Sequence, residues 1–352
     1  MDKKESRRLA KNSQFAIAAS MEAISNAEMD LNNFDRSNVG VIIGSGSGGT
    51  VPETEKETIQ MFNENRNTIS PIYVPKMLPN MASSNVSRIF KLEGYSNAVS
   101  TACAAGTQAI GEAYEVILRG DADIMLAGGA EAPFCETTLG GFCNMNALTS
   151  QNNNPKIASK PFDKNRDGFV PSEGSAVIIL EKLENALNRG KAPIAEIIGY
   201  SCTSDAHHLV QPEPEGKGAT NAMNKALKKA NLNCEDIDYI NAHGTSTPTN
   251  DKVETLAIKK VFGDHSYNLK INSTKSIIGH SSGAAGAMEA IACAKSLSEQ
   301  KIHGTINYST PDPECDLDYT PNKSIDYEIN YALSNSFGFG GHNSCIILSK
   351  FS

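Results

Sequence analysis

The sequence lacks the features that would place it among membrane, secreted or nucleic-acid-binding proteins. No apolar run approaches the ~18–20 residues that a transmembrane helix needs. The N-terminus is polar and basic, without the apolar core of a secretory signal. The net charge of −8 argues against nucleic acid as the main partner. With 39% hydrophobic and 20% charged residues, the composition is typical of a soluble globular protein, and no membrane association is expected.

Cysteine patterns that bind metals are absent as well. The eight cysteines are scattered, none forms a Cys-x-x-Cys pair, and no histidine pair has zinc-finger spacing. We therefore expect no metal site. Apolar neighbours around Cys293 and Cys345 indicate reduced core residues. A reducing compartment follows, either the bacterial cytoplasm or the matrix of a plastid or mitochondrion.

Apolar segments with strand and helix periodicity alternate along the chain, which predicts a layered α/β fold. Helices are expected at residues 12–27, 75–90, 104–118, 217–230, 251–261 and 282–297. Strands are expected at residues 39–43, 95–100, 123–127, 176–180, 194–204, 237–241 and 269–273, with paired strands over 324–348. No low-complexity linker separates these segments, so we expect one compact body.

Cys103 stands where a β-like run, Tyr95 to Ser100, gives way to a helix of small residues. The N-terminus of a helix supplies partial positive charge and free N–H groups, which favour the thiolate over the thiol. A core cysteine is the commoner explanation when such a residue is considered alone.

Two histidines favour a nucleophilic role for Cys103 over a role in the core. His243 and His280 lie in turns that contain glycine, at 241–247 and 275–280. Like Cys103, both follow predicted strands, where side chains can converge on a cleft. One cysteine with two histidines predicts carbon–carbon bond formation on a thioester.

The segments around these residues match a known family over nearly the whole chain. The matching stretches are Ser100–Gly106, Gly128–Glu131, Pro161–Gly168, Asn241–Pro248, Ser273–His280, Gly283–Gly286 and Asn335–Asn343. In them the chain resembles a β-ketoacyl-acyl-carrier-protein synthase of the elongating (I/II) class, within the thiolase superfamily. The resemblance implies a thiolase-like fold, in which two fused βαβαβαββ halves form a five-layer αβαβα body, and a homodimer. We place the halves at residues 1–190 and 191–352.

The resemblance also implies an activity, that of a 3-oxoacyl-[acyl-carrier-protein] synthase in type II fatty acid elongation. No cofactor is expected, because the phosphopantetheine of acyl carrier protein carries both substrates. Cys103 would accept the acyl group as a thioester, and its backbone N–H would form an oxyanion hole with that of Phe339. His243 and His280 would stabilise the enolate that forms when the malonyl group loses carbon dioxide.

Further residues are assigned by the same resemblance. Lys275 would orient the site electrostatically, supported by Glu289 and Asp251. Phe339 would also act as a gate that swings when the cysteine is acylated. The substrate-binding residues would be Thr245 and Thr247 for the phosphopantetheine arm, and Phe142 and Ser47 for the acyl pocket. The basic rim that docks the acidic carrier protein would consist of Lys4, Arg7, Arg8 and Arg66.

The sequence departs from the family pattern at three places. Family members usually begin with an apolar strand that this sequence lacks, and we expect that strand to be central in the first sheet. Ser47 replaces an apolar residue, which predicts room for longer or less selective acyl groups. His342 replaces a commoner threonine, and a structural role is expected for it.

Other functions remain open at this stage. A polyketide ketosynthase uses the same cysteine and two histidines, and the motifs do not separate it from a fatty acid synthase. A non-catalytic partner such as a chain-length factor, or an inactive fragment, is a different class. Such partners typically lose the nucleophilic cysteine, whereas this sequence keeps it.

Overall fold

The computed structural model describes residues 3–351 and contains two sheets with helices between and outside them. The helices are α1 (Lys3–Ser6), α2 (Lys11–Asn26), α3 (Thr50–Asn63), α4 (Tyr73–Met77), α5 (Met81–Phe90), α6 (Ala105–Arg119), α7 (Glu136–Asn144), α8 (Leu183–Asn188), α9 (Lys217–Ala230), α10 (Pro248–Phe262), α11 (Lys275–Ile278) and α12 (Ala285–Glu299). The strands are β1 (Val39–Gly44), β2 (Ser96–Val99), β3 (Ile124–Glu131), β4 (Gly174–Glu181), β5 (Ala195–Ser204), β6 (Tyr239–Asn241), β7 (Lys270–Asn272), β8 (Lys301–Ile302), β9 (Ile325–Asp326), β10 (Tyr331–Gly338) and β11 (His342–Lys350).

The two main sheets repeat one topology. The first has the strand order β2-β1-β3-β4 and the second the order β5-β11-β10-β6-β7. In each, two parallel pairings are followed by an antiparallel one, β3 with β4 in the first sheet and β10 with β11 in the second. The second sheet has one strand more, because β5 pairs with β11 at its edge.

This comparison bears on the expected position of the additional strand that family members carry. The strand of the second half that precedes β6 is β5, and it lies at a sheet edge rather than in the centre. By the same topology, the counterpart of β5 in the first half would lie at the edge, beside β4. The topology of the second sheet thus favours an edge position for that strand, and its place in the first sheet stays a prediction.

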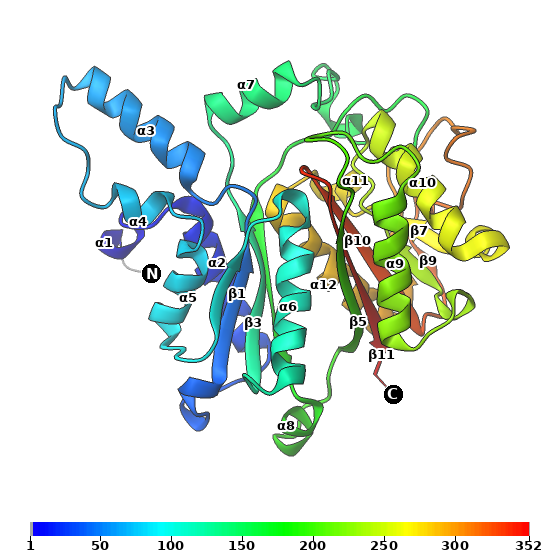
Figure 1. Cartoon of the computed structure of the whole chain (residues 1–352), viewed down its shortest axis with the longest axis horizontal. Coiled ribbons are helices and arrows are strands. Elements are labelled where there is room, and N and C mark those ends of the chain that lie inside the picture. The colour runs from blue at the N-terminus through cyan, green and yellow to red at the C-terminus, as the bar shows by residue number, and fades with distance from the viewer. Residues whose placement is uncertain (1–2, 352) are drawn as a thin grey trace.

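Five layers result, and three apolar cores fill the contacts between them (Figure 1). Helices α2 and α5 cover the outer face of the first sheet, with Ile17 and Val86 in that core. Helices α9 and α10 cover the outer face of the second sheet, with Met223 and Ile258 in that core. The third core lies between the sheets, around α6 and α12. The predicted five-layer αβαβα arrangement is thus confirmed.

The two central helices begin in the same way, and this positions the site. Each follows a three-residue 3-10 turn, Ala102–Ala104 before α6 and Ser282–Ala284 before α12. Both turns begin with a left-handed residue, since φ is +50° at Ala102 and +45° at Ser282. A β-carbon on Gly106 would lie 2.8 Å from the carbonyl oxygen of Gly283, so only glycine allows the helices to approach so closely.

One predicted helix is divided into two in the structure. The segment 75–90 was expected as one helix, but it is divided into α4 and α5 by residues 78–80. Leu78 has an extended backbone (ψ 133°) and precedes Pro79, whose ring disfavours a helical conformation in the residue before it.

Candidate active site

A cavity of about 550 Å³ is lined by residues of both halves. It brings together most of the residues that the sequence predicts for catalysis and substrate binding, namely Cys103, His243, His280, Phe339, Ser47, Phe142, Thr245 and Thr247. A pocket of this volume suits a small molecule or a substrate arm.

Cys103 lies in the turn before α6, within reach of a histidine. Its Sγ atom is 3.1 Å from Nε2 of His280. Burial raises the pKa of the Cys103 thiol to about 12, although the charge of Lys275 lowers it. The expectation of a resting thiolate is therefore not met, because desolvation outweighs the favourable charges around the sulfur.

The two histidines face each other in the cavity. Their ring centroids are 5.5 Å apart at 87°, and both side chains are buried. Burial holds the pKa of both rings well below 6.5, and the positive charge of Lys275 lowers both further. The imidazoles are therefore neutral, and each carries one N–H donor.

Lys275 is buried beside the two histidines and contacts one of them. Its Nζ atom lies 3.3 Å from Nδ1 of His243 and forms a hydrogen-bonded ion pair with Glu289. Both partners of the ion pair are fully buried, at 1% and 0% exposure. The predicted pairing of Lys275 with Glu289 is present in the structure.

Glu254 is a residue that the sequence analysis misses. Its two carboxylate oxygens accept the backbone N–H groups of His243 and Gly244, each at 2.8 Å. Burial raises the pKa of Glu254 to about 7, although these two N–H groups lower it. Glu254 thus fixes the main chain at His243. Glu254 stands three residues after Asp251, on the same helix face. This spacing of two carboxylates was the signal in the sequence that could have identified Glu254.

Glu131 is a second residue whose role was missed, although it belongs to a motif matched above. It accepts the N–H groups of Gly46 at 2.5 Å and Gly283 at 3.1 Å. The hydroxyls of Ser45 and Ser47 donate to it at 3.1 and 3.2 Å. One buried carboxylate therefore joins the turn after β1 to the start of α12. A carboxylate after two glycines at the end of a buried strand was the sequence signal.

The turn of Phe339 packs against the nucleophile. A β-carbon on Gly338 would lie 2.5 Å from the carbonyl oxygen of Thr101 and 3.2 Å from the backbone nitrogen of Cys103. Gly340 and Gly341 have φ angles of +84° and +77°, which other residues rarely adopt. Glycine is thus required on both sides of Phe339.

The predicted substrate-binding residues line the cavity at separate places. The hydroxyls of Thr245 and Thr247 lie 2.8 Å apart. Phe142, on α7, contacts Phe169 edge to face with centroids 5.5 Å apart. Ser47 points its hydroxyl at Glu131.

Two other predicted residues, Asp251 and Arg66, do not line the cavity. Asp251 accepts the N–H of Phe162 at 2.8 Å and pairs with Arg166 at 3.5 Å. It therefore supports the loop around Phe162, and no hydrogen bond within residues 3–351 joins it to a catalytic side chain. Arg66 pairs with Glu64 at 2.9 Å and with Glu57 at 3.6 Å.

Three buried oxygens beside the site have no hydrogen-bond partner within the described chain. They are Oδ1 of Asn241, Oε2 of Glu289 and Oγ of Ser334. Asn241 and Ser334 are register partners on β6 and β10, and α12 packs on β10. Among residues 3–351 no group of three or more histidine, cysteine, aspartate or glutamate side chains could hold a metal ion.

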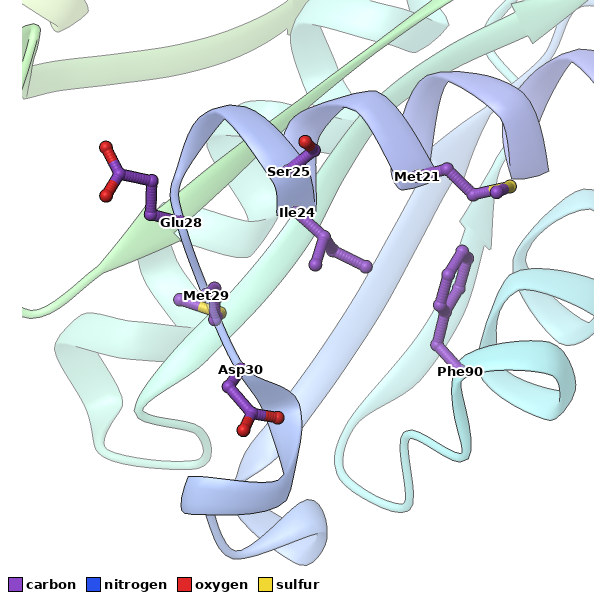
Figure 2. Close-up of a pocket in the computed structure, with 7 residues that line it drawn as sticks. All are labelled: Met21, Ile24, Ser25, Glu28, Met29, Asp30 and Phe90. Atoms are coloured by element: carbon purple, nitrogen blue, oxygen red, sulfur yellow. The ribbon is translucent and has the colours of Figure 1, made fainter.

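A second hollow, of about 440 Å³, lies on the outer surface between α2 and the end of α5. Figure 2 shows Met21, Ile24 and Phe90 around it. Its two carboxylates have structural partners, since Glu28 pairs with Lys191 and Asp30 caps the 3-10 helix that follows it. It therefore offers no catalytic chemistry comparable to that of the cavity.

Comparison with known proteins agrees with the geometry. The family model for the β-ketoacyl synthase N-terminal domain matches residues 1–186, and that for the C-terminal domain matches residues 194–309. Curated relatives include 3-oxoacyl-[acyl-carrier-protein] synthase 2 from Staphylococcus aureus (strain N315) and its namesake from Synechocystis sp.. Each is 45% identical over 351 residues, which cover 100% of this chain and 84% of the relative.

Solved structures give the same result. A β-ketoacyl synthase from Burkholderia phymatum has a TM-score of 0.91 and 35% identity, covering 100% of this chain and 85% of that one. A type II polyketide ketosynthase, solved in complex with its acyl-carrier protein AntF, has a TM-score of 0.93 and 36% identity, covering 97% and 85%. The chain therefore belongs to the β-ketoacyl synthase family of condensing acyltransferases.

Proposed function

We propose that this protein is an elongating 3-oxoacyl-[acyl-carrier-protein] synthase, which condenses an acyl group with malonyl carrier protein. The observation that carries the proposal is the 3.1 Å approach of His280 Nε2 to Cys103 Sγ, with the ring of His243 beside that of His280. One nucleophile and two neutral N–H donors can then act on the same reacting group.

In the first half of the reaction, Cys103 Sγ forms a bond to the thioester carbonyl carbon of the acyl carrier. The carrier sulfur leaves and takes the thiol proton, so that the acyl group remains on the enzyme. The N–H groups of Cys103 and Phe339 stabilise the tetrahedral oxyanion. The close packing of Gly338 on the Cys103 turn supports this assignment.

In the second half, the bond between the malonyl α-carbon and its carboxylate breaks. Carbon dioxide leaves, and the electron pair forms an enolate whose oxygen accepts hydrogen bonds from His243 and His280. The enolate carbon then attacks the acyl carbonyl carbon, and the sulfur of Cys103 leaves and regains a proton. The products are a 3-oxoacyl carrier protein and carbon dioxide, and no step uses a cofactor.

The carrier protein docks on basic surface residues in this proposal. Lys4, Arg7 and Arg8 are exposed around α1, whereas Arg66 is half-buried and already paired with two glutamates. Arg66 is therefore expected to contribute least. One solved relative is a ketosynthase bound to its acyl-carrier protein, which supports a partner of this kind.

A homodimer is the proposed assembly. Strand β2 ends the first sheet, so one of its edges is unpaired among residues 3–351, and two of its residues are exposed. Helix α3 has no buried residue and projects from the body (Figure 1). On and after it, Phe62 is 83% exposed and Val74 56% exposed. A second copy would cover this apolar surface.

A reducing compartment suits the proposed enzyme. All eight cysteines are free thiols in the structure. Between residues 3 and 351, no helix is long and apolar enough to cross a membrane. The curated relatives named above are bacterial, which favours a bacterial cytoplasm over an organelle matrix.

A polyketide ketosynthase is the alternative function. Solved ketosynthases of polyketide type are 28–36% identical to this chain, whereas the curated fatty acid relatives reach 45%. The nucleophile is retained, which argues against a non-catalytic chain-length factor.

The test is a reconstituted reaction of the purified chain with acyl and malonyl carrier protein. We expect 3-oxoacyl carrier protein and carbon dioxide in equal amounts, detected by mass spectrometry and isotope release, after a single round of extension. The Cys103→Ala variant should form no condensed product. Repeated extension without ketone reduction would instead support the polyketide function, and product from Cys103→Ala would refute both.

A further inference from the structure

The two catalytic histidines are held in place by different parts of the molecule. Fixed charges support His243, because Glu254 binds its main chain and Lys275 binds its Nδ1 atom. His280 has no such support. Its Nδ1 atom is buried without a hydrogen-bond partner within residues 3–351. Catalytic and metal-bound histidines are usually oriented by a hydrogen bond at the second ring nitrogen, so something else must orient this ring.

Phe169 fills that role. Its ring meets the ring of His280 edge to face, with centroids 5.1 Å apart at 76°. Phe169 is 5% exposed and lines the cavity. The His280 ring also contacts Cys103 and the ring of His243, which themselves take part in the reaction.

The main chain of His280 is held by the same segment, residues 168–172, which we call the strap. The N–H of His280 donates to the carbonyl of Val170 at 2.7 Å, and the N–H of Ser172 donates to the carbonyl of His280 at 3.0 Å. Gly279, just before His280, has a φ of +73°, and a β-carbon there would lie 2.9 Å from the carbonyl oxygen of Val170. Glycine therefore permits this close contact.

The other edge of the strap is bonded to the wall of the acyl pocket. Phe169 donates its N–H to the carbonyl of Ala147 at 3.0 Å and accepts the N–H of Thr149 at 3.1 Å. Its ring also contacts that of Phe142, with centroids 5.5 Å apart. Phe142 and Ala147 both line the cavity, on α7 and directly after it.

That wall is the loosely packed side of the cavity. Helix α7 has no buried residue, and β-carbons added at Gly140 and Gly141 would meet nothing within 4 Å. Figure 1 shows α7 standing apart from the five layers. Segments with so few buried contacts move at low free-energy cost. An acyl chain that fills the pocket can therefore displace Phe142 more readily than it can displace the sheets.

We propose that the strap couples acyl-chain length to decarboxylation, with Phe169 as the positioning residue. An acyl chain on Cys103 that presses on Phe142 shifts Phe169 and so sets the orientation of His280 for the malonyl enolate. His243, held by Glu254 and Lys275, is not reached by this path. Chain-length selectivity then arises in the second half of the reaction, and not only when the acyl group binds. The inference rests on the function proposed above.

The test uses full-length enzyme acylated on Cys103 with either a hexanoyl or a tetradecanoyl group. Single-turnover release of carbon dioxide from malonyl carrier protein is measured for each, and acyl transfer onto Cys103 is measured separately. For the wild type we expect decarboxylation rates that differ between the two chains by at least about fivefold, the lower end of typical coupling between sites. In Phe169→Leu the two rates should become equal within about twofold, since the ring contacts are lost.

Four further variants make the result specific. Phe169→Tyr keeps the ring and should restore the chain-length dependence. Phe142→Leu should abolish it as Phe169→Leu does, and the double variant should add nothing. Phe337→Leu removes a ring 5.6 Å from that of His243, and it should change both rates by the same factor.

The possible outcomes distinguish a failure of the proposed role of the strap from a failure of the proposed function. Equal decarboxylation with both chains in the wild type, or unchanged chain-length dependence in Phe169→Leu, would overturn the role of the strap. Equal losses of acyl transfer and decarboxylation in Phe169→Leu would show a structural role instead. A wild type that is never acylated on Cys103 would refute the proposed function itself.

Discussion

The ammonium nitrogen of Lys275 lies 3.3 Å from Nδ1 of His243. An ammonium group can only donate, so Nδ1 accepts and the proton of the neutral ring resides on Nε2. A buried lysine thus sets the tautomer of a catalytic histidine, while Glu289 neutralises its charge. The single N–H that His243 can offer to an enolate is thereby fixed.

The stability of the Lys275–Glu289 pair can be tested by removing one partner. Lys275→Met should lower the free energy of unfolding by about 3–5 kcal/mol, because it leaves a buried carboxylate unpaired. The double variant Lys275→Met/Glu289→Met should recover most of that loss while remaining inactive. Chemical denaturation measures both. As a control, Lys295→Met disrupts an exposed pair with Glu299 and should cost less than about 1 kcal/mol. Equal effects at the two sites would contradict the burial argument.

His280→Ala should separate the two halves of the reaction. Loss of one enolate donor should slow malonyl decarboxylation by about 100- to 1,000-fold. Acyl transfer to Cys103 should persist at a reduced rate, because the nucleophile and its turn are unchanged. Carbon dioxide release and acyl-enzyme formation are measured in parallel. Loss of acyl transfer with intact decarboxylation would reverse the assigned role.

The pH dependence of Cys103 alkylation follows from its raised pKa. Only the thiolate reacts, so the rate with iodoacetamide should rise about tenfold per pH unit from neutrality upward, without a plateau below the pKa of about 12. The charge of Lys275 lowers that pKa more than the charge of Glu289 raises it, so the Lys275→Met/Glu289→Met variant should react more slowly at every pH below it. Peptide mapping confines the measurement to Cys103. A plateau near neutral pH would indicate a resting thiolate instead.

Ser47→Ile should narrow the acyl pocket. Ser47 lines the cavity and donates to Glu131, and a larger apolar side chain at this position would take up space in the cavity. Discrimination against long acyl chains, measured as the ratio of kcat/KM for short and long acyl carriers, should rise by about tenfold or more. Ser47→Ala, which keeps the small size, should preserve the wild-type profile. Identical profiles for wild type and Ser47→Ile would refute this role.

Charge reversal around α1 should weaken carrier docking. Changing Arg7 and Arg8 to glutamate should raise KM for the acyl carrier and reduce its dependence on salt, with kcat unchanged. Changing Arg66, which two glutamates already neutralise, should have a smaller effect on KM. Kinetics at several salt concentrations measure both. A larger effect on KM at Arg66 than at Arg7 and Arg8 would contradict carrier docking at the residues around α1.

Several elements of the fold could be predicted because their sequence signals are local. The helix expected at 217–230 is present as α9 with those limits, since its apolar residues follow helical spacing. The strand expected at 194–204 is present as β5, one residue shorter. Helix α3 was not predicted, and it buries no residue in the structure.

The sequence alone determined the types of reacting group and the family that uses them, because Cys103, His243 and His280 stand in specific motifs. Only the tertiary structure decided how those groups are supported. The carboxylates of Glu131 and Glu254 act on backbone N–H groups of other segments, and their positions in the sequence do not reveal which N–H groups they accept. The pKa of Cys103 was decided in the same way, since desolvation depends on every layer packed around the sulfur and not on its position at a helix N-terminus.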